Sequence, residues 1–180
     1  MLRITIPATE LFDNRTQTFI STKEQTLQLE HSLVSLSKWE SKWCKPFLDP
    51  KAKKTLEETI DYIKCMTITQ NVDPDVYNSL SQNNIDEINA YISAPMTATT
   101  FYEEPKGGKK ETITSELIYY WMITFNIPME CQKWHLNKLL TLVRVCSIKN
   151  APPKKVGRKE MASRYASLNA ARRSKYNTNG

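Results

Sequence analysis

The sequence predicts an α+β protein that is predominantly α-helical, with a small N-terminal β-hairpin, a helical bundle and a basic C-terminal extension. Three observations predict this class. Apolar and polar residues alternate in parts of the first 30 residues, and apolar residues recur at three- and four-residue steps from there to residue 150. The last 30 residues are rich in Lys and Arg. We therefore expect a mainly helical globular domain over residues 1–150 and a basic arm over residues 151–180.

The N-terminal segment is typical of a β-hairpin. Leu2–Ile6 alternates with period two, and Pro7 limits such a strand to an edge or an end. The turn residues 13–15 follow, so we expect Thr18–Ser21 to return as the partner strand. Thr26–Glu30 is expected to be a further extended piece.

Helical spacing begins after this segment. Apolar residues at three- and four-residue steps predict a helix from about Leu29 towards Phe47, which Pro46 stops. Residues that cap helix N-termini predict where the later helices begin. In chain order these are Thr55 with Glu58, Asp73 before Pro74, Asn84 with Glu87, and Thr114.

The most hydrophobic stretch of the chain is Leu117–Phe125. It is apolar nearly all round, so we expect a central buried helix. Asn126–Pro128 breaks the chain and starts another helix. The inner face of that helix is expected to hold Leu136, Leu139 or Leu140, Val143 and Cys146. The polar segment Pro105–Lys110 is expected to form an exposed loop tip.

Candidate catalytic and metal-binding residues are few. Cys131 and His135 are spaced i, i+4 on a predicted helix, as two metal ligands can be, but no second pair stands at ligand spacing. We therefore interpret Cys131 as a core thiol and His135 as a partly exposed helix residue. The residues after Gly108 are Lys109 and Lys110, which do not fit a phosphate-binding loop. The sequence predicts a protein that is not an enzyme and needs no cofactor or metal.

The four cysteines contain no C-x-x-C pair, and three of them lie in apolar segments. Buried free thiols are expected, which fits a reducing compartment. The N-terminus lacks the apolar region of a secretory signal, and no apolar run approaches the roughly 18 residues that span a bilayer. We expect an intracellular protein without a membrane partner.

Two tryptophans, Trp39 and Trp43, are spaced i, i+4 among charged residues. We favour the interpretation that they cover the core with one face of a helix. The alternative is a partner-binding edge, because tryptophan is enriched in interface hot spots.

Charge is distributed unevenly along the chain. Residues 151–180 hold eight basic side chains and the single acid Glu160, a net charge of +7, whereas the first 150 residues hold 17 basic and 18 acidic ones, a net charge of −1. We predict that the basic side chains contact a partner. They are Lys154, Lys155, Arg158, Lys159, Arg164, Arg172, Arg173 and Lys175.

Three interpretations of this arm remain open. It binds nucleic acid, it folds against an acidic protein surface, or it only solubilises the chain. The apolar residues Met161, Tyr165 and Leu168 fall on one side of a possible helix, but three such residues cannot hold an isolated helix in water. Ordering of the arm is therefore expected to need a partner.

Four stretches of the sequence carry a resemblance to known proteins. They are Leu33–Trp43 with Lys45–Phe47, Ile113–Met122, Gln132–Leu142, and the Arg-rich end that closes with Asn177–Gly180. These stretches resemble a group of proteins from the tail-morphogenesis region of tailed bacteriophages and prophages, most nearly tail assembly chaperones. The resemblance covers most of the chain.

The resemblance implies a small helical protein that self-associates and coats the long, coiled-coil tape measure protein of the phage tail. Such a protein keeps the tape measure soluble in the host cytoplasm until tail tube subunits assemble around it. The resemblance brings no catalytic residues. Two alternatives are a structural protein of the virion, in its neck, tail or baseplate, and a nucleic-acid-binding protein that uses the basic arm.

Overall fold

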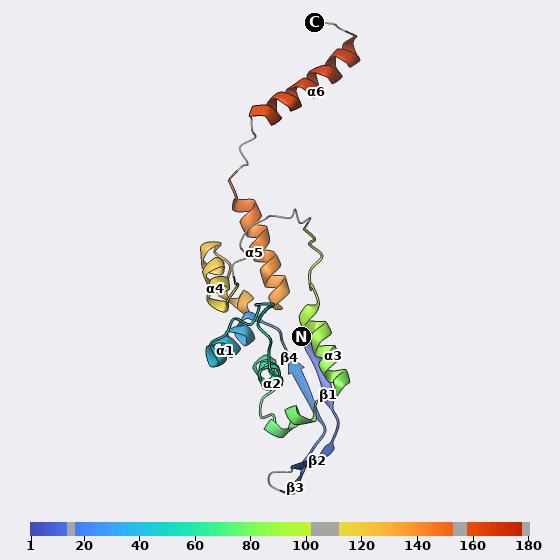
Figure 1. The fold of residues 1–180 in the computed structure, drawn as a ribbon, viewed down its shortest axis with the longest axis vertical. Coiled ribbons are helices and arrows are strands. Elements are labelled where there is room, and N and C mark those ends of the chain that lie inside the picture. The colour runs from blue at the N-terminus through green and yellow to red at the C-terminus, as the bar shows by residue number, and fades with distance from the viewer. Residues whose placement is uncertain (14–16, 102–111, 153–157, 178–180) are drawn as a thin grey trace. The chain divides into compact units, whose positions relative to one another are not determined.

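The computed structural model of the chain describes residues 1–13, 17–101, 112–152 and 158–177 (Figure 1). Helices account for 57% of it, and small antiparallel strand pairs lie near the N-terminus. The predicted class, α+β and predominantly helical, is confirmed. The chain divides into two compact units, Met1–Ile148 and Lys149–Gly180, and each is described by itself.

The N-terminal strands form one hairpin in two sections. Its strands are β1 (Leu2–Ile6), β2 (Thr9–Asp13), β3 (Thr18–Thr22) and β4 (Gln25–Leu29). β1 pairs with β4 and β2 pairs with β3, both antiparallel and in one unbroken register. Pro7 lies in the gap between the sections, where it has no N–H to give to the ladder.

The predicted pairing inside this hairpin is wrong. Leu2–Ile6 pairs with Gln25–Leu29, the piece expected to be merely extended, and not with Thr18–Ser21. Strand β2 was not predicted. It pairs with β3, the segment that was expected to pair with β1. Pro7 does limit β1 to an edge strand that ends at Ile6, as expected, but pairing resumes beyond it between β2 and β3.

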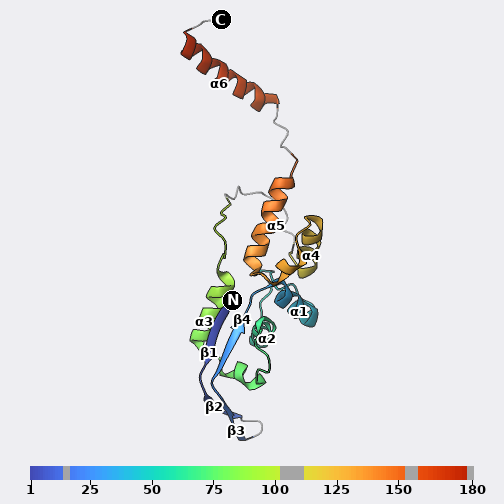
Figure 2. The same ribbon diagram turned by 180° about the vertical axis from the view of Figure 1, so that it is seen from behind.

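The β1–β4 pair lies between α2 (Leu56–Met66) and α3 (Gln82–Ser93) in both views (Figures 1 and 2). A short 3₁₀ helix, η1 (Pro74–Ser79), connects these two helices. Alternate strand residues point into the first of two apolar clusters, as period two requires. The buried strand residues there are Ile4, Ile6, Leu27 and Leu29.

Helix α1 (Leu33–Trp43) joins the two clusters. It begins after Ser32, whose hydroxyl accepts from the amide of Ser35, so the predicted start at Leu29 is too early. Leu33 and Leu36 enter the second cluster, and Trp39 enters the first. Trp39 is almost fully buried, which confirms the preferred interpretation of this residue.

Most predicted helix starts are confirmed. Thr55 and Glu58 form a capping box at α2, Asp73 caps η1, and Thr114 caps the helix that follows it. The prediction at Asn84 is wrong, because Ser81 caps α3 and Asn84 is the third helical residue of that capping box. The motif is real, but it lies three residues earlier than predicted.

The second cluster is built by α4 (Ser115–Thr124), the 3₁₀ helix η2 (Met129–Lys133) and α5 (Leu136–Asn150), together with α1. The predicted inner face of α5 is largely confirmed, since Leu136, Leu139 and Val143 are buried while Cys146 is half-buried. None of the described helices combines the length and the hydrophobicity that a membrane crossing requires.

Three further expectations need correction. Cys44 is exposed, not buried, because it ends α1 in a left-handed conformation with φ of 51°. Cys131 and His135 do not share a helix, since Cys131 lies in η2 and His135 precedes α5. His135 is also buried, whereas we expected partial exposure. The predicted loop tip Pro105–Lys110 lies outside the described residues.

Candidate functional site

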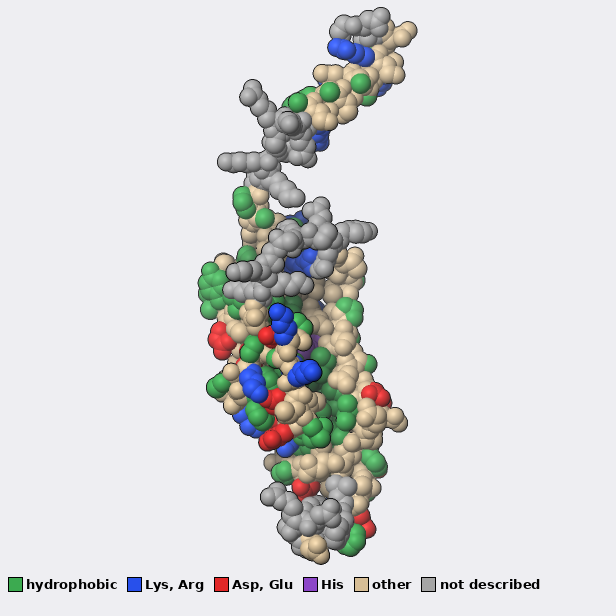
Figure 3. Space-filling view, in the orientation of Figure 1, with side chains coloured by type: hydrophobic (Ala, Val, Ile, Leu, Met, Phe, Trp, Pro, Cys, Tyr) green, Lys and Arg blue, Asp and Glu red, His purple; other side chains and the backbone are tan. Residues whose placement is uncertain are grey.

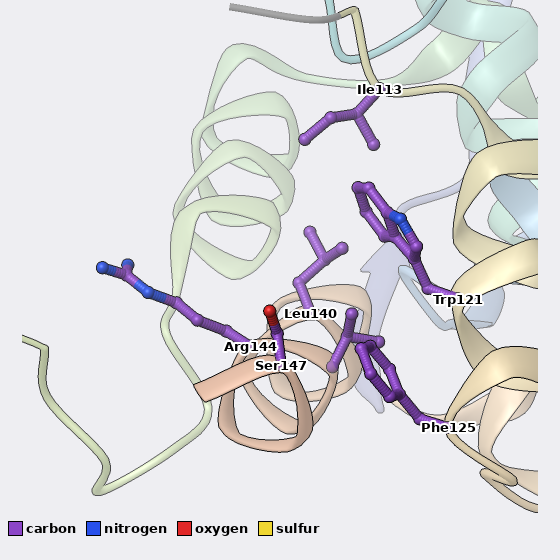
Figure 4. A pocket seen from close by; sticks show the side chains of 7 residues that line it. Ile113, Trp121, Phe125, Leu140, Arg144 and Ser147 are labelled. Atoms are coloured by element: carbon purple, nitrogen blue, oxygen red, sulfur yellow. The ribbon is translucent and has the colours of Figure 1, made fainter. Parts of the chain in front are cut away.

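An open apolar hollow of about 390 Å³ lies between α4 and α5. In Figure 4, Trp121 and Phe125 project from α4 towards Leu140 and Ser147 on α5, and Ile113 lies at one end. Val143 and Arg144 complete the lining. We call this hollow the α4–α5 groove. Its walls offer apolar surface and little that could hold a small polar ligand in place.

The sequence explains why the groove forms. On α4, Ile118 and Met122 are buried in the second cluster, so Trp121 and Phe125 fall at its edge and are only half-buried. On α5, Leu139 is fully buried in the same cluster, and the residues beside it line the groove. Two helices that share one core therefore leave their flanking apolar side chains facing each other across solvent.

The start of α4 is fixed by a buried carboxylate. Glu40 of α1 accepts the amide hydrogen of Ser115 with Oε2 at 2.7 Å and that of Phe47 with Oε1 at 2.8 Å. These two contacts join α1 and the segment that follows it to the distant start of α4. An acid at a helix N-terminus is also favoured by the helix dipole, so Glu40 holds the first wall of the groove in place.

A second acid lies at the same helix end. The backbone amide of Glu116 and the Thr114 hydroxyl hold the pKa of the Glu116 carboxyl below its usual value. This is the favourable position that the sequence predicts for Glu116. Because the side chain is exposed, it marks a charged end of an otherwise apolar wall.

The outer face of α4 is also apolar, and it is exposed. Tyr120 is 61% exposed and Ile123 is 68% exposed. Figure 3 shows hydrophobic side chains gathered over α4. The prediction that Leu117–Phe125 is buried all round is therefore wrong. The second cluster is too small to surround this helix, and an exposed apolar patch of this kind is typical of an interaction surface.

Arg144 is the charged residue of the groove. Its guanidinium carbon lies 4.1 Å from the centroid of the Phe101 ring, at the distance of a cation–π contact. Lys138, outside the lining of the groove, lies over the ring of the partly exposed Trp134, with Nζ 4.5 Å from the ring centroid. On the α5 side, Arg144 therefore supplies the cation that borders the apolar surface of the groove.

The two histidines meet in the interior, which the sequence did not predict. The rings of His31 and His135 are 5.2 Å apart between centroids, edge to face. His31 is 2% exposed, and its Nδ1 lies 2.5 Å from the Tyr62 hydroxyl. Burial, helped by the neighbouring His135, lowers the pKa of His31 to about 4.

His135 is held from two sides. Its Nδ1 accepts the amide hydrogen of Asn137 at 3.3 Å, so Nε2 carries the ring hydrogen and donates to the carbonyl of Tyr91 at 3.0 Å. Burial lowers the pKa of His135 as well. Both rings are therefore neutral at neutral pH, and they connect β4, α2 and α3 with the start of α5.

The eight basic residues predicted to contact a partner belong to the C-terminal unit. Four of them are exposed on α6 (Arg158–Tyr176), namely Arg164, Arg172, Arg173 and Lys175. Arg158 and Lys159 begin that helix, while Lys154 and Lys155 lie outside the described residues. Contact with a partner stays a prediction for all eight.

Comparison of the chain with protein-family models, curated proteins and solved structures found no match. Across the described ranges, His, Cys, Asp and Glu side chains nowhere gather in groups of three that could hold a metal ion. The site is therefore interpreted from its own geometry.

Sequence reasoning missed Tyr120 and Ile123 as surface residues. The signal that could have found them is the all-round apolar character of residues 117–125. In a domain of about 150 residues, a helix without a polar face is either enclosed or left partly exposed, and only the packing decides between the two.

Proposed function

We propose that this chain is a tail assembly chaperone of a tailed bacteriophage, which binds a tail protein through the α4–α5 groove and the exposed face of α4. The observation that carries the proposal is the apolar surface itself. Tyr120 and Ile123 lie exposed on the outer face of α4, and Trp121, Phe125 and Leu140 line the α4–α5 groove. Surfaces of this kind are typical of protein interfaces.

The position of this surface supports the proposal in a second way. Two of the three long segments that resemble tail assembly chaperones, Ile113–Met122 and Gln132–Leu142, form the walls of the groove or lead into them. The resemblance and the exposed apolar surface therefore meet in one place.

The tape measure protein is the client that this geometry suits. A coiled-coil protein without its partner strands exposes an apolar stripe along each helix, which must be covered to prevent aggregation. A groove between two helices accepts one such stripe, with apolar anchors at helical spacing. Self-association of the chain, which the resemblance implies, would array several grooves along one long client.

Co-expression with the tape measure protein of the same phage or prophage tests the proposal. The measurement is the fraction of tape measure protein that stays soluble after cell lysis, with and without this chain. We expect the intact chain to raise that fraction and the double variant Tyr120→Gln, Ile123→Gln to lose the effect. Each lost apolar contact weakens binding by about tenfold or more.

The matched control is the double variant Leu56→Gln, Ile68→Gln. Leu56 and Ile68 are also exposed and apolar but lie at the two ends of the α2 region, away from the groove. This variant is expected to keep the tape measure protein soluble. An equal loss with both variants would contradict the assignment to the exposed face of α4.

Mass spectrometry of purified particles separates chaperone from structural protein. A chaperone is abundant in the lysate of infected cells and missing from mature particles. A fixed copy number in the particles would overturn the proposal and favour a component of the neck, tail or baseplate.

A further inference from the structure

Helix α6 carries its cations on opposite sides. From Met161 to Asn177 every side chain is exposed, and this stretch contains no acidic residue. Arg164 and Arg173 are nine residues apart, which at 3.6 residues per turn places them about 180° apart around the helix. A partner that contacts both must present negative charge on two sides.

The apolar residues of α6 do not form a clear docking face. Met161, Tyr165 and Leu168 follow one another at steps of four and three, but the next position on that side is Arg172. An apolar groove that enclosed this side would also enclose the Arg172 guanidinium. Burying a charge without a paired acid is costly, so a purely apolar partner is disfavoured.

Charge also disfavours a second copy of the arm as the partner. Each arm carries a net charge of +7, so two arms repel each other. The globular body, at −1, offers little compensating charge. The partner that suits α6 is therefore a strongly anionic one.

The shape of the helix matches a duplex groove. Between the cations the side chains are mostly small, which keeps the helix narrow. The small residues are Ala162, Ser163, Ala166, Ser167, Ala170, Ala171 and Ser174. An α-helix about 10–12 Å in diameter fits the major groove of B-form DNA, which is about 12 Å wide and has phosphates along both walls.

We propose that the C-terminal arm binds double-stranded DNA without sequence preference, with α6 in a groove and with Arg164 and Arg173 contacting phosphates on opposite walls. Arg172 and Lys175 contact phosphates farther along the same helix. Such contacts position a protein on the duplex and carry no sequence information. The arm uses no residue of the α4–α5 groove, so this function is separate from client binding.

Fluorescence anisotropy of the full chain with a labelled duplex of about 20 base pairs and mixed sequence tests the proposal, at salt concentrations from about 50 to 200 mM. The variant Arg164→Gln, Arg172→Gln, Arg173→Gln, Lys175→Gln removes the four cations that are exposed on α6. We expect it to lose about 100-fold or more in affinity at the lowest salt. The slope of log affinity against log salt should become shallower by about 3 to 4.

A matched control removes four exposed lysines of the body instead, through Lys23→Gln, Lys38→Gln, Lys51→Gln and Lys53→Gln. Its net charge equals that of the arm variant, so an equal loss of affinity would overturn the assignment to α6. Absence of duplex binding by the full chain at low salt would overturn the proposal outright.

Two further probes separate DNA from an acidic protein partner. Poly-glutamate that binds as tightly as the duplex at the same salt would overturn the proposal in favour of an acidic protein surface. The variant Met161→Gln, Leu168→Gln is expected to keep duplex affinity within about threefold, because phosphates gain nothing from apolar side chains. A loss as large as that of the arm variant would contradict the proposed mode of binding.

Discussion

Helices α5 and α6 are both basic, but they differ in the burial of their apolar side chains. Three cations and no acid lie in α5, and from Met161 onward α6 likewise contains only basic charges. Yet α5 buries Leu136, Leu139 and Val143 in the second cluster, while every described side chain of α6 is exposed. The difference lies in the apolar stripe, which continues through the turns of α5 and is interrupted by Arg172 in α6. A basic helix joins a core when its apolar stripe is unbroken, and otherwise remains available to a partner.

The largest expected effect comes from shortening a leucine in each of the two helices. Leu139→Ala should lower the free energy of unfolding by about 2–5 kcal/mol, because Leu139 is fully buried and its loss leaves a cavity. Leu168→Ala should change it by less than about 0.5 kcal/mol, because Leu168 is 47% exposed. Urea denaturation followed by tryptophan fluorescence measures both. Equal effects would show that α6 packs as α5 does.

Acid should destabilise the body through the histidine pair. The pKa of His31 is about 4 when folded and about 6.5 when unfolded, so below pH 6.5 the unfolded state binds more protons. Stability present above pH 6.5 is therefore lost as the pH falls towards 4. Titration of His31 alone should lower the free energy of unfolding by about 2 kcal/mol between pH 7 and pH 5. Titration of His135 lowers it further in the same direction.

Denaturation curves at the two pH values check this, with His31→Gln as the comparison. That variant should flatten the pH dependence, leaving the part due to His135. If it proves too unstable to study, NMR titration of His31 in the unaltered chain gives the same answer. A titration midpoint near pH 6.5 would contradict the buried, neutral pair.

Loss of the Glu40 carboxylate should have a smaller effect. Glu40→Gln leaves one amide hydrogen, of Ser115 or Phe47, without an acceptor, which costs about 1–3 kcal/mol. Glu87→Gln, at an exposed position on α3, is the matched control and should change stability by less than about 0.5 kcal/mol. Thermal unfolding compares them, and equal midpoints would argue that Glu40 does not fix the start of α4.

The smallest effect concerns a helix cap. Thr55→Ala removes the hydroxyl that accepts from the Glu58 amide at 3.2 Å and should cost about 1 kcal/mol. Thr59→Ala, one turn into the same helix, should change stability little, since its hydroxyl only returns to the Thr55 carbonyl. Denaturation midpoints rank the two variants, and the reverse order would contradict the capping box.

Local signals in the sequence predicted much of the fold. The capping box of Thr55 with Glu58, the alternation of Leu2–Ile6 and the inner face of α5 depend on neighbours within a few residues, and the structure confirms them. The strand pairing was wrong because β2 was not predicted, so its partner β3 was assigned to β1. The register between strands that lie this far apart in the chain is decided by the whole hairpin and not by one residue.

The groove and the buried polar contacts were beyond sequence reasoning for a physical reason. Glu40 meets Ser115 across 75 residues, and His31 meets His135 across more than 100. No periodicity reports such contacts. Likewise, the exposure of Tyr120 depends on how much core remains to cover α4, which only the packed structure reveals.

A crossed binding measurement tests most directly the claim that the two units bind different partners. The α4-face variant Tyr120→Gln, Ile123→Gln and the four-residue arm variant are each assayed for tape measure solubility and for duplex DNA affinity. The α4-face variant is predicted to lose the first and keep the second within about threefold, and the arm variant to do the opposite. If either variant loses both activities while remaining folded, one surface serves both partners and the account is contradicted.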